Sequence, residues 1–204
     1  DVSTVRALGF CVSVEHAVFM AEVFNKSGIP AVAVSAATPS EDRRAALLDL
    51  SAGRMRIVFS VDLFNEGVDV PAVDALLMLR ATDSPTLFLQ QLGRGLRKSS
   101  DKSLCTVLDF VGNHRREFRF DRILRALLGG SRKDVEKQVE QGFPFLPAGC
   151  HMELDAVATE IVLRNIRAAV PTRWNDKAAE LQALGQGKPD ISLAQFMELT
   201  GLEL

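Results

Sequence analysis

Two arginines, Arg94 and Arg97, lie three residues apart in the polar segment QQLGRGLRK at residues 90–98. A guanidinium group stays charged and can donate two parallel hydrogen bonds to phosphate oxygens, which a lysine cannot reproduce. Where such an arginine reaches a transferred phosphoryl group, it accelerates the reaction by roughly 10³ to 10⁵. Taken alone, the segment fits a phosphate clamp and a charged helix end equally well. The acidic segment FSVDLFNEGVDVP at residues 59–71 precedes it and favours the clamp.

The composition is that of a folded protein with little net charge. The 204 residues are 47% hydrophobic, with a net charge of −2 and a pI near 6.0, which predicts one or two domains and no general affinity for nucleic acid. No apolar run reaches the roughly 18 residues of a membrane span, and no signal pattern opens the chain, so we expect a cytoplasmic protein without membrane contact. Three cysteines without CxxC spacing predict neither disulfides nor a metal site.

The first half of the chain alternates short apolar runs with amphipathic segments. Such alternation predicts an α/β fold, a parallel sheet with helices on both faces. We expect strands of four to eight residues, buried on both faces, in the runs 7–14, 31–35, 56–61, 73–79 and 104–110. Helices are expected between them at residues 15–27, 40–52 and 85–97.

From about residue 113 the apolar pattern becomes helical. An apolar stripe precedes Gly129 and is formed by Phe118, Leu124, Leu127 and Leu128. Further helices are expected at residues 133–141, 154–169, 176–184 and 192–200. We therefore predict an α/β domain at residues 1–112 and a mainly helical accessory domain at residues 113–204.

Three segments, read in order, resemble a known family. FCVSVEHA at residues 10–17, IVFSVDLFNEGVDVP at 57–71 and QQLGRGLRK at 90–98 resemble motifs IV, V and VI of superfamily 2 helicases. The resemblance implies the second RecA-like domain of such a motor, and we expect all three motif loops at the carboxyl ends of the strands. The tail segments GFPFLPAGC and ISLAQFMELTGL resemble the region after motif VI in a bacterial branch of these proteins.

The resemblance implies contacts with ATP. Arg97 would be the arginine finger that reaches the γ-phosphate and Arg94 the second clamp, so these two are the expected catalytic residues. The expected nucleotide contacts are Gln90, Gly67 and Asp69. We interpret Asp62 and Glu66 as loop anchors rather than as an acid–base pair, because the glutamate that activates water belongs to the first domain in this family.

The resemblance also implies contacts with nucleic acid. Ser13, Thr38 and Ser60 would touch the backbone of one strand. The segment TPSEDRR at residues 38–44 fits an ordinary capped helix start equally well, and we interpret His16 as structural. Basic residues in the tail could contact phosphates, although a solvated face is the favoured interpretation; they are Arg115, Arg116, Arg119, Arg122 and Arg125.

Two motifs of a complete motor are missing from the sequence. There is no GxxxxGK[ST] loop to hold phosphate and no DExx box to hold magnesium, so this chain alone is not expected to hydrolyse ATP. ATP and Mg²⁺ would be held mostly by a first RecA-like domain, which we expect upstream because the chain begins with Asp rather than Met.

The sequence therefore predicts the C-terminal motor half of an ATP-dependent helicase or translocase. DNA is favoured over RNA as the partner, because the NEGVD form of motif V resembles that of restriction and repair motors. Two alternatives stay open: a non-catalytic α/β module that binds a nucleotide or a protein, and the motor part of a restriction enzyme.

Overall fold

The computed structural model describes residues 3–61, 63, 73–82, 84–96, 104–111, 118–168, 178, 181–182 and 192–200. The chain forms two compact units. Unit 1 comprises residues 1–82 and 86–110, and unit 2 comprises residues 83–85 and 111–204. The predicted domain limit after residue 112 falls at residues 112–117, outside the described residues, and it stays a prediction.

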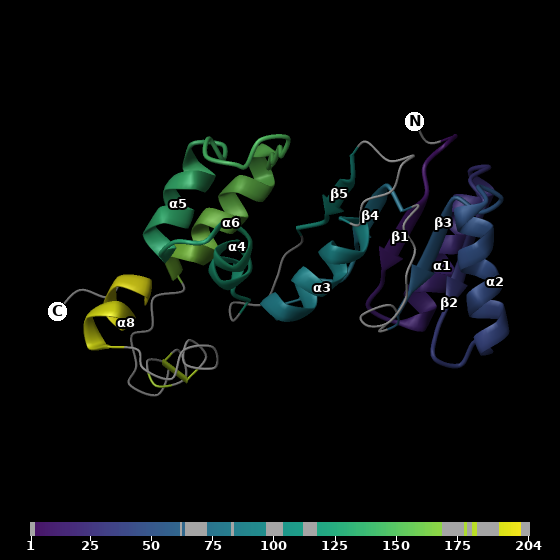
Figure 1. The fold of residues 1–204 in the computed structure, drawn as a ribbon, viewed down its shortest axis with the longest axis horizontal. Helices are drawn as coiled ribbons and strands as arrows, with labels where there is room; N and C mark the ends of the chain where they lie inside the picture. The colour runs from purple at the N-terminus through teal and green to yellow at the C-terminus, as the bar shows by residue number, and fades with distance from the viewer. Residues whose placement is uncertain are drawn as a thin grey trace. The chain divides into compact units, whose positions relative to one another are not determined.

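Unit 1 contains a five-stranded parallel sheet in the order β2-β3-β1-β4-β5 (Figure 1). Its strands are β1 (Ala7–Phe10), β2 (Ala31–Val34), β3 (Ile57–Ser60), β4 (Ala75–Met78) and β5 (Thr106–Asp109). Its helices are α1 (Val14–Lys26), α2 (Ser40–Ser51) and α3 (Pro85–Gly95). The predicted α/β fold class is confirmed, because every expected strand and helix of this half is present.

Helices α1 and α3 lie on opposite faces of the sheet. Phe24 of α1 packs edge-on against Phe59 of β3, with ring centroids 5.4 Å apart. Gly9 pairs with both Phe59 and Leu77, so these three residues share one face. Helix α3 approaches Leu76 instead, which points to the other face because side chains alternate along a strand. The sheet is thus covered from both sides.

The edge strand β5 departs from the sequence-based expectation. Strands β1, β3 and β4 are buried throughout, but Thr106, Leu108 and Asp109 of β5 are exposed. The prediction that every strand is buried on both faces is therefore wrong for β5. Within the described part of the chain, β5 pairs with β4 alone, and burial of a strand depends on its neighbours rather than on its own composition.

Unit 2 is helical, as predicted. Its helices are α4 (Phe120–Leu128), α5 (Arg132–Glu140), α6 (Ala156–Ala168) and α8 (Leu193–Thr200). Helices α4, α5 and α6 share an apolar core formed by Phe120, Val135, Val139, Phe143, Val162 and Ile166. Most of the helix predicted at residues 176–184 lies outside the described residues. None of the helices described here is long and apolar enough to cross a bilayer.

A capping box begins α5. The Ser131 hydroxyl accepts a hydrogen bond from the Asp134 N–H at 3.3 Å, and the Asp134 carboxylate accepts one from the Ser131 N–H at 2.8 Å. Hydrogen bonds from the Ser131 hydroxyl and backbone lower the pKa of Asp134. The start of this helix is therefore fixed by local chemistry as well as by packing.

Candidate functional site

Three predicted nucleic-acid contacts lie at the carboxyl edge of the sheet. Ser13 follows β1, Thr38 follows β2, and Ser60 ends β3. Because β2, β3 and β1 are neighbours in that order, the sheet places the three residues at adjacent positions along one edge. Ligands of open parallel sheets bind at this edge. Segments that are distant in the sequence are thus brought together here.

The loop after β1 is closed by two local hydrogen bonds. The Ser13 hydroxyl accepts a hydrogen bond from the His16 N–H at 3.2 Å, and Nδ1 of His16 accepts one from the Val12 N–H at 3.4 Å. These bonds support the structural interpretation of His16. The pKa of Glu15 is lowered by its own backbone N–H and then by the Ser13 hydroxyl, so the hydroxyl hydrogen of Ser13 is shared with this carboxylate inside the loop.

The loop after β2 is a tight turn held by Thr38. Its hydroxyl accepts a hydrogen bond from the Ser35 N–H at 2.9 Å, and its N–H donates to the Ser35 carbonyl at 3.0 Å. The N-cap of α2 is Pro39, which provides no side-chain capping bond. Thr38 therefore fixes the turn rather than capping the helix, and its hydroxyl hydrogen can also be donated outward.

Ser60 has a different environment. It is 1% exposed, its hydroxyl donates to the Gly9 carbonyl at 3.5 Å, and its carbonyl accepts from the Cys11 N–H at 2.8 Å. These contacts join β3 to β1, so the hydroxyl contact predicted for Ser60 has no support in this geometry. Burial also raises the pKa of the neighbouring Cys11 thiol to about 11, which keeps it protonated.

Helix α3 presents Gln90 and Arg94 on its outward side. The two residues are one turn apart; Gln90 is exposed and Arg94 is half-buried. The opposite side of the helix is buried and holds Phe88, Gln91, Leu92 and Gly95. The helix thus fixes the backbone below Arg94, and Gln90 is exposed on its outward side.

The arginine end of α3 does not lie at the carboxyl edge. Gly95 packs against Leu76 in the first half of β4 and against Cys105, directly before β5. The helix therefore runs back toward the amino ends of these strands, as crossover helices of parallel sheets do. The expectation that all three motif loops share the carboxyl edge is wrong for the third segment. The predicted site is divided between the two edges.

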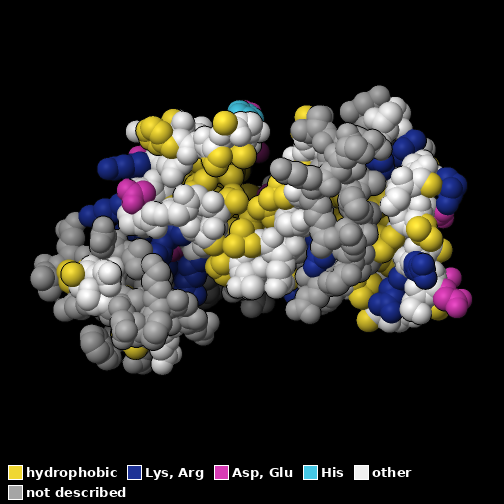
Figure 2. Space-filling view, in the orientation of Figure 1, with side chains coloured by type: hydrophobic (Ala, Val, Ile, Leu, Met, Phe, Trp, Pro, Cys, Tyr) yellow, Lys and Arg dark blue, Asp and Glu magenta, His cyan; other side chains and the backbone are white. Residues whose placement is uncertain are grey.

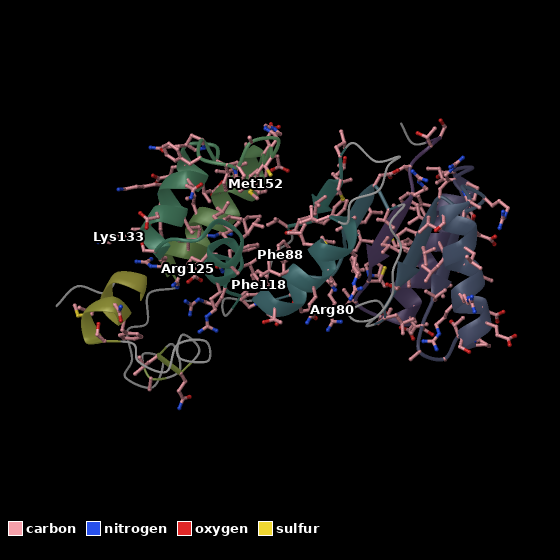
Figure 3. The ribbon with its side chains drawn as sticks, viewed as in Figure 1. Arg80, Phe88, Phe118, Arg125, Lys133 and Met152 are labelled. Carbon is pink, nitrogen blue, oxygen red and sulfur yellow. The ribbon has the colours of Figure 1, made fainter. Side chains whose placement is uncertain are left out.

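Sequence reasoning missed one cation at the carboxyl edge. Arg80 is half-buried and follows the carboxyl end of β4, next to β1 in the sheet (Figure 3). A guanidinium here is suited to an anionic backbone that also meets Ser13. The signal in the sequence was a lone arginine directly after an apolar run. Other predicted residues lie outside the described residues, and their roles stay predictions: Arg97, Gly67, Asp69, Asp62 and Glu66.

The arginines of unit 2 are partly structural. Arg119 forms two hydrogen bonds of 2.7 Å with the carboxylate of Asp121, which is 1% exposed. The buried Arg132 donates to the Ile166 carbonyl at 2.9 Å. Figure 2 shows the Lys and Arg side chains of unit 2 at several separate places on the visible face. The favoured interpretation of a solvated face does not describe Arg119, whose side chain is largely buried against Asp121. Arg115 and Arg116 lie outside the described residues.

No cluster of three His, Cys, Asp or Glu side chains that could hold a metal ion occurs among the described residues. The chemistry of the described edges is therefore that of hydroxyl and guanidinium groups. Such groups can bind anionic oxygens.

The order of strands, the crossover helices and the two polar edges define a RecA-like α/β lobe. Residues 2–99 match the helicase conserved C-terminal domain family. A 51.5 kDa protein of a Lactococcus phage is 38% identical over 108 residues, which cover 53% of this chain and 24% of the relative. A Schizosaccharomyces pombe protein, provisionally named a mitochondrial ATP-dependent helicase, irc3, is 36% identical over 109 residues, or 53% of this chain and 18% of the relative.

A solved structure has the same fold. The Escherichia coli DEAD-box protein SrmB, solved with the regulator of ribonuclease activity A, superposes with a TM-score of 0.52 at 19% identity, over 60% of this chain and 70% of that chain. Residues 2–99 therefore form a helicase conserved C-terminal domain, which is the second RecA-like lobe in superfamily 2 helicases. The chain spans no more than about a quarter of the length of the two relatives.

Proposed function

We propose that this chain is the C-terminal motor half of an ATP-dependent DNA helicase or translocase. One observation carries the proposal. The helix that ends near Arg94 packs at one edge of the sheet, and loops with hydroxyl side chains lie at the opposite edge. Arg94 and Gln90 belong to the first edge, and Ser13 and Thr38 belong to the second. Because the sheet is rigid, a movement that ATP imposes on one edge also moves the other.

The described residues fit the phosphates of ATP held by a partner lobe. Arg94 is half-buried on a helix whose inner side is fixed, so its guanidinium has a restricted set of positions. Gln90, one turn away, can donate and accept hydrogen bonds beside it. ATP bound with Mg²⁺ would supply the phosphoryl group whose hydrolysis drives the motor. We assign the finger role to Arg97 on the resemblance of QQLGRGLRK to motif VI.

The carboxyl edge suits a nucleic-acid backbone rather than bases. Thr38 offers a hydroxyl hydrogen from a fixed turn, Ser13 lies after a nearby strand at the same edge, and Arg80 adds a positive charge. Contacts of this kind position a strand without reading its sequence. The choice of DNA over RNA rests on the NEGVD form of motif V.

The test is ATP turnover by the full-length protein, with and without single-stranded DNA, duplex DNA and RNA. We expect turnover that DNA stimulates and that Arg97→Ala lowers by about 10³-fold or more. Stimulation by RNA alone would replace DNA as the partner. Turnover that is absent or indifferent to Arg97→Ala would overturn the motor function in favour of a nucleotide- or protein-binding module.

A matched control removes a different arginine. Arg54 forms a surface ion pair with Asp49 at 2.6 Å, and its side chain is 67% exposed. Arg54→Ala also deletes a guanidinium group, but at a position far from Gln90 and Arg94 in the sequence. Turnover of Arg54→Ala should stay within about two-fold of wild type, because a surface ion pair contributes little to stability. An equal loss in both variants would show a general effect of charge.

A further inference from the structure

Helix α3 approaches the sheet closely at Gly95. A Cβ atom added to this residue would lie 2.5 Å from Sγ of Cys105 and 2.8 Å from Cδ1 of Leu76. Ordinary contacts between such atoms are about 3.5 to 4.0 Å. Leu76 is fully buried in β4 and has no space into which to withdraw. The absence of a side chain at Gly95 therefore determines how closely the helix lies on the sheet.

Gly93 shows that this closeness is not a property of the whole helix. A Cβ atom on Gly93 would meet no described atom within 4 Å. Arg94 lies between the two glycines. Gly95 is on the buried side of the helix, and Gly93 is exposed. The position of the Arg94 backbone is thus set directly by the contact that Gly95 makes.

We infer that Gly95 is a positioning residue of the phosphate-binding helix, a conclusion that rests on the proposed motor function. A methyl group at this position would force α3 to withdraw from Leu76 and Cys105 by about an ångström before contacts became normal. Arg94 moves with the helix backbone. A displacement of about 1 Å can cost about 10²-fold in rate when the reacting groups must be held in place.

The experiment measures kcat and KM for ATP in the full-length protein at saturating DNA, beside its thermal unfolding. Gly95→Ala should lower kcat by about 10- to 100-fold, expressed per folded molecule. The matched control is Gly9→Ala, whose Cβ would lie 2.3 Å from Cδ1 of Phe59 on the other face of the sheet. It overpacks the same unit without touching α3, so it should lower the unfolding temperature and leave kcat per folded molecule within about three-fold of wild type.

Two further variants test the same contact, and the first of them does so even if Gly95→Ala does not fold. Cys105→Leu enlarges the facing side of the same contact, at a half-buried position before the edge strand, and should also lower kcat. Cys105→Ala should restore part of the kcat lost in Gly95→Ala, since it removes the sulfur that the methyl group meets. Equal kcat in Gly95→Ala and Gly9→Ala, or an unchanged kcat in Cys105→Leu, would overturn the inference. A wild-type protein without turnover would instead overturn the motor function itself.

Discussion

Arg94 of unit 1 differs from Arg119 and Arg132 of unit 2 in the direction its side chain takes. In unit 1 the sheet interior is apolar, and Arg94 stands on the outward side of α3. In unit 2, Arg119 and Arg132 turn inward to bind Asp121 and the Ile166 carbonyl. A parallel sheet satisfies its own backbone groups, whereas short helices joined by loops leave polar groups that side chains must satisfy. Arg94 thus stands on a helix face that looks away from the sheet, whereas Arg119 and Arg132 bind groups inside their unit.

The largest expected effect tests the outward arginine. Arg94→Lys keeps the positive charge but removes the planar fork, so DNA-stimulated turnover of the full-length protein should fall by about 10²-fold or more. The unfolding temperature should stay near that of wild type, because Arg94 does not hold the core together in this interpretation. A large fall in the unfolding temperature, measured by calorimetry, would place Arg94 with the inward arginines and remove the contrast.

The next effect tests the inward arginine. Arg119→Ala leaves the buried carboxylate of Asp121 without its bidentate partner, and the free energy of unfolding should fall by about 3 to 5 kcal/mol. The double variant Arg119→Met with Asp121→Leu removes both charges and should recover most of this loss. Denaturant titration of the chain measures both variants. Equal losses in the single and double variants would mean that packing, not charge pairing, dominates here.

A smaller effect compares one device that both units share. Asn165 accepts from the Phe120 N–H at 3.1 Å and donates to the Phe118 carbonyl at 2.6 Å, while Asn25 binds the N–H and carbonyl of Ala31 at 3.0 and 2.8 Å. Asn165 is half-buried and Asn25 is exposed. Alanine should therefore cost about 1 to 3 kcal/mol at Asn165 and about 1 kcal/mol or less at Asn25. A larger loss in the free energy of unfolding at Asn25 than at Asn165, measured by denaturant titration, would contradict this ranking by burial.

The smallest effect concerns pH. The pKa values of Glu15 and Asp134 are lowered, that of Glu15 by its own backbone N–H and then by the Ser13 hydroxyl, and that of Asp134 by the hydroxyl and then the backbone of Ser131. A lowered pKa in the folded state stabilises the fold at higher pH, and this contribution is lost as pH falls through and below the ordinary values of 4.5 and 3.8. Glu15→Gln and Asp134→Asn should each flatten the acid limb of a stability–pH curve. An unchanged acid limb in both variants would exclude these caps as its origin.

The elements of unit 1 were predictable because each strand is a continuous apolar run between turn residues. The exposure of β5 was not, since LCTVLDF is as apolar as the buried runs and only its place at the edge distinguishes it. The ordered motifs implied ligand contacts for Gln90 and Arg94, which the structure places on the outward side of α3. They did not predict that α3 carries Arg94 away from the carboxyl edge, because that depends on the direction of a crossover helix.

Buried polar groups account for the remaining differences. Ser60 has the composition of a ligand-binding edge residue, yet its hydroxyl binds the neighbouring strand. Asp121 and Arg132 are charged, and nothing in their local sequence distinguishes them from surface residues. Their burial follows from which helix packs beside them. Long-range pairing of this kind is invisible to a pattern that extends over only a few residues.

The buried Cys11 thiol makes the chain suited to selective labelling. With a pKa of about 11 and almost no accessible surface, Cys11 holds very little reactive thiolate at neutral pH. Cys150 is exposed, and Cys105 is partly accessible. A Cys105→Ala variant would therefore direct a maleimide fluorophore to Cys150 in unit 2 without replacement of Cys11. Such a probe would report on unit 2 while the core cysteine of unit 1 stays unmodified.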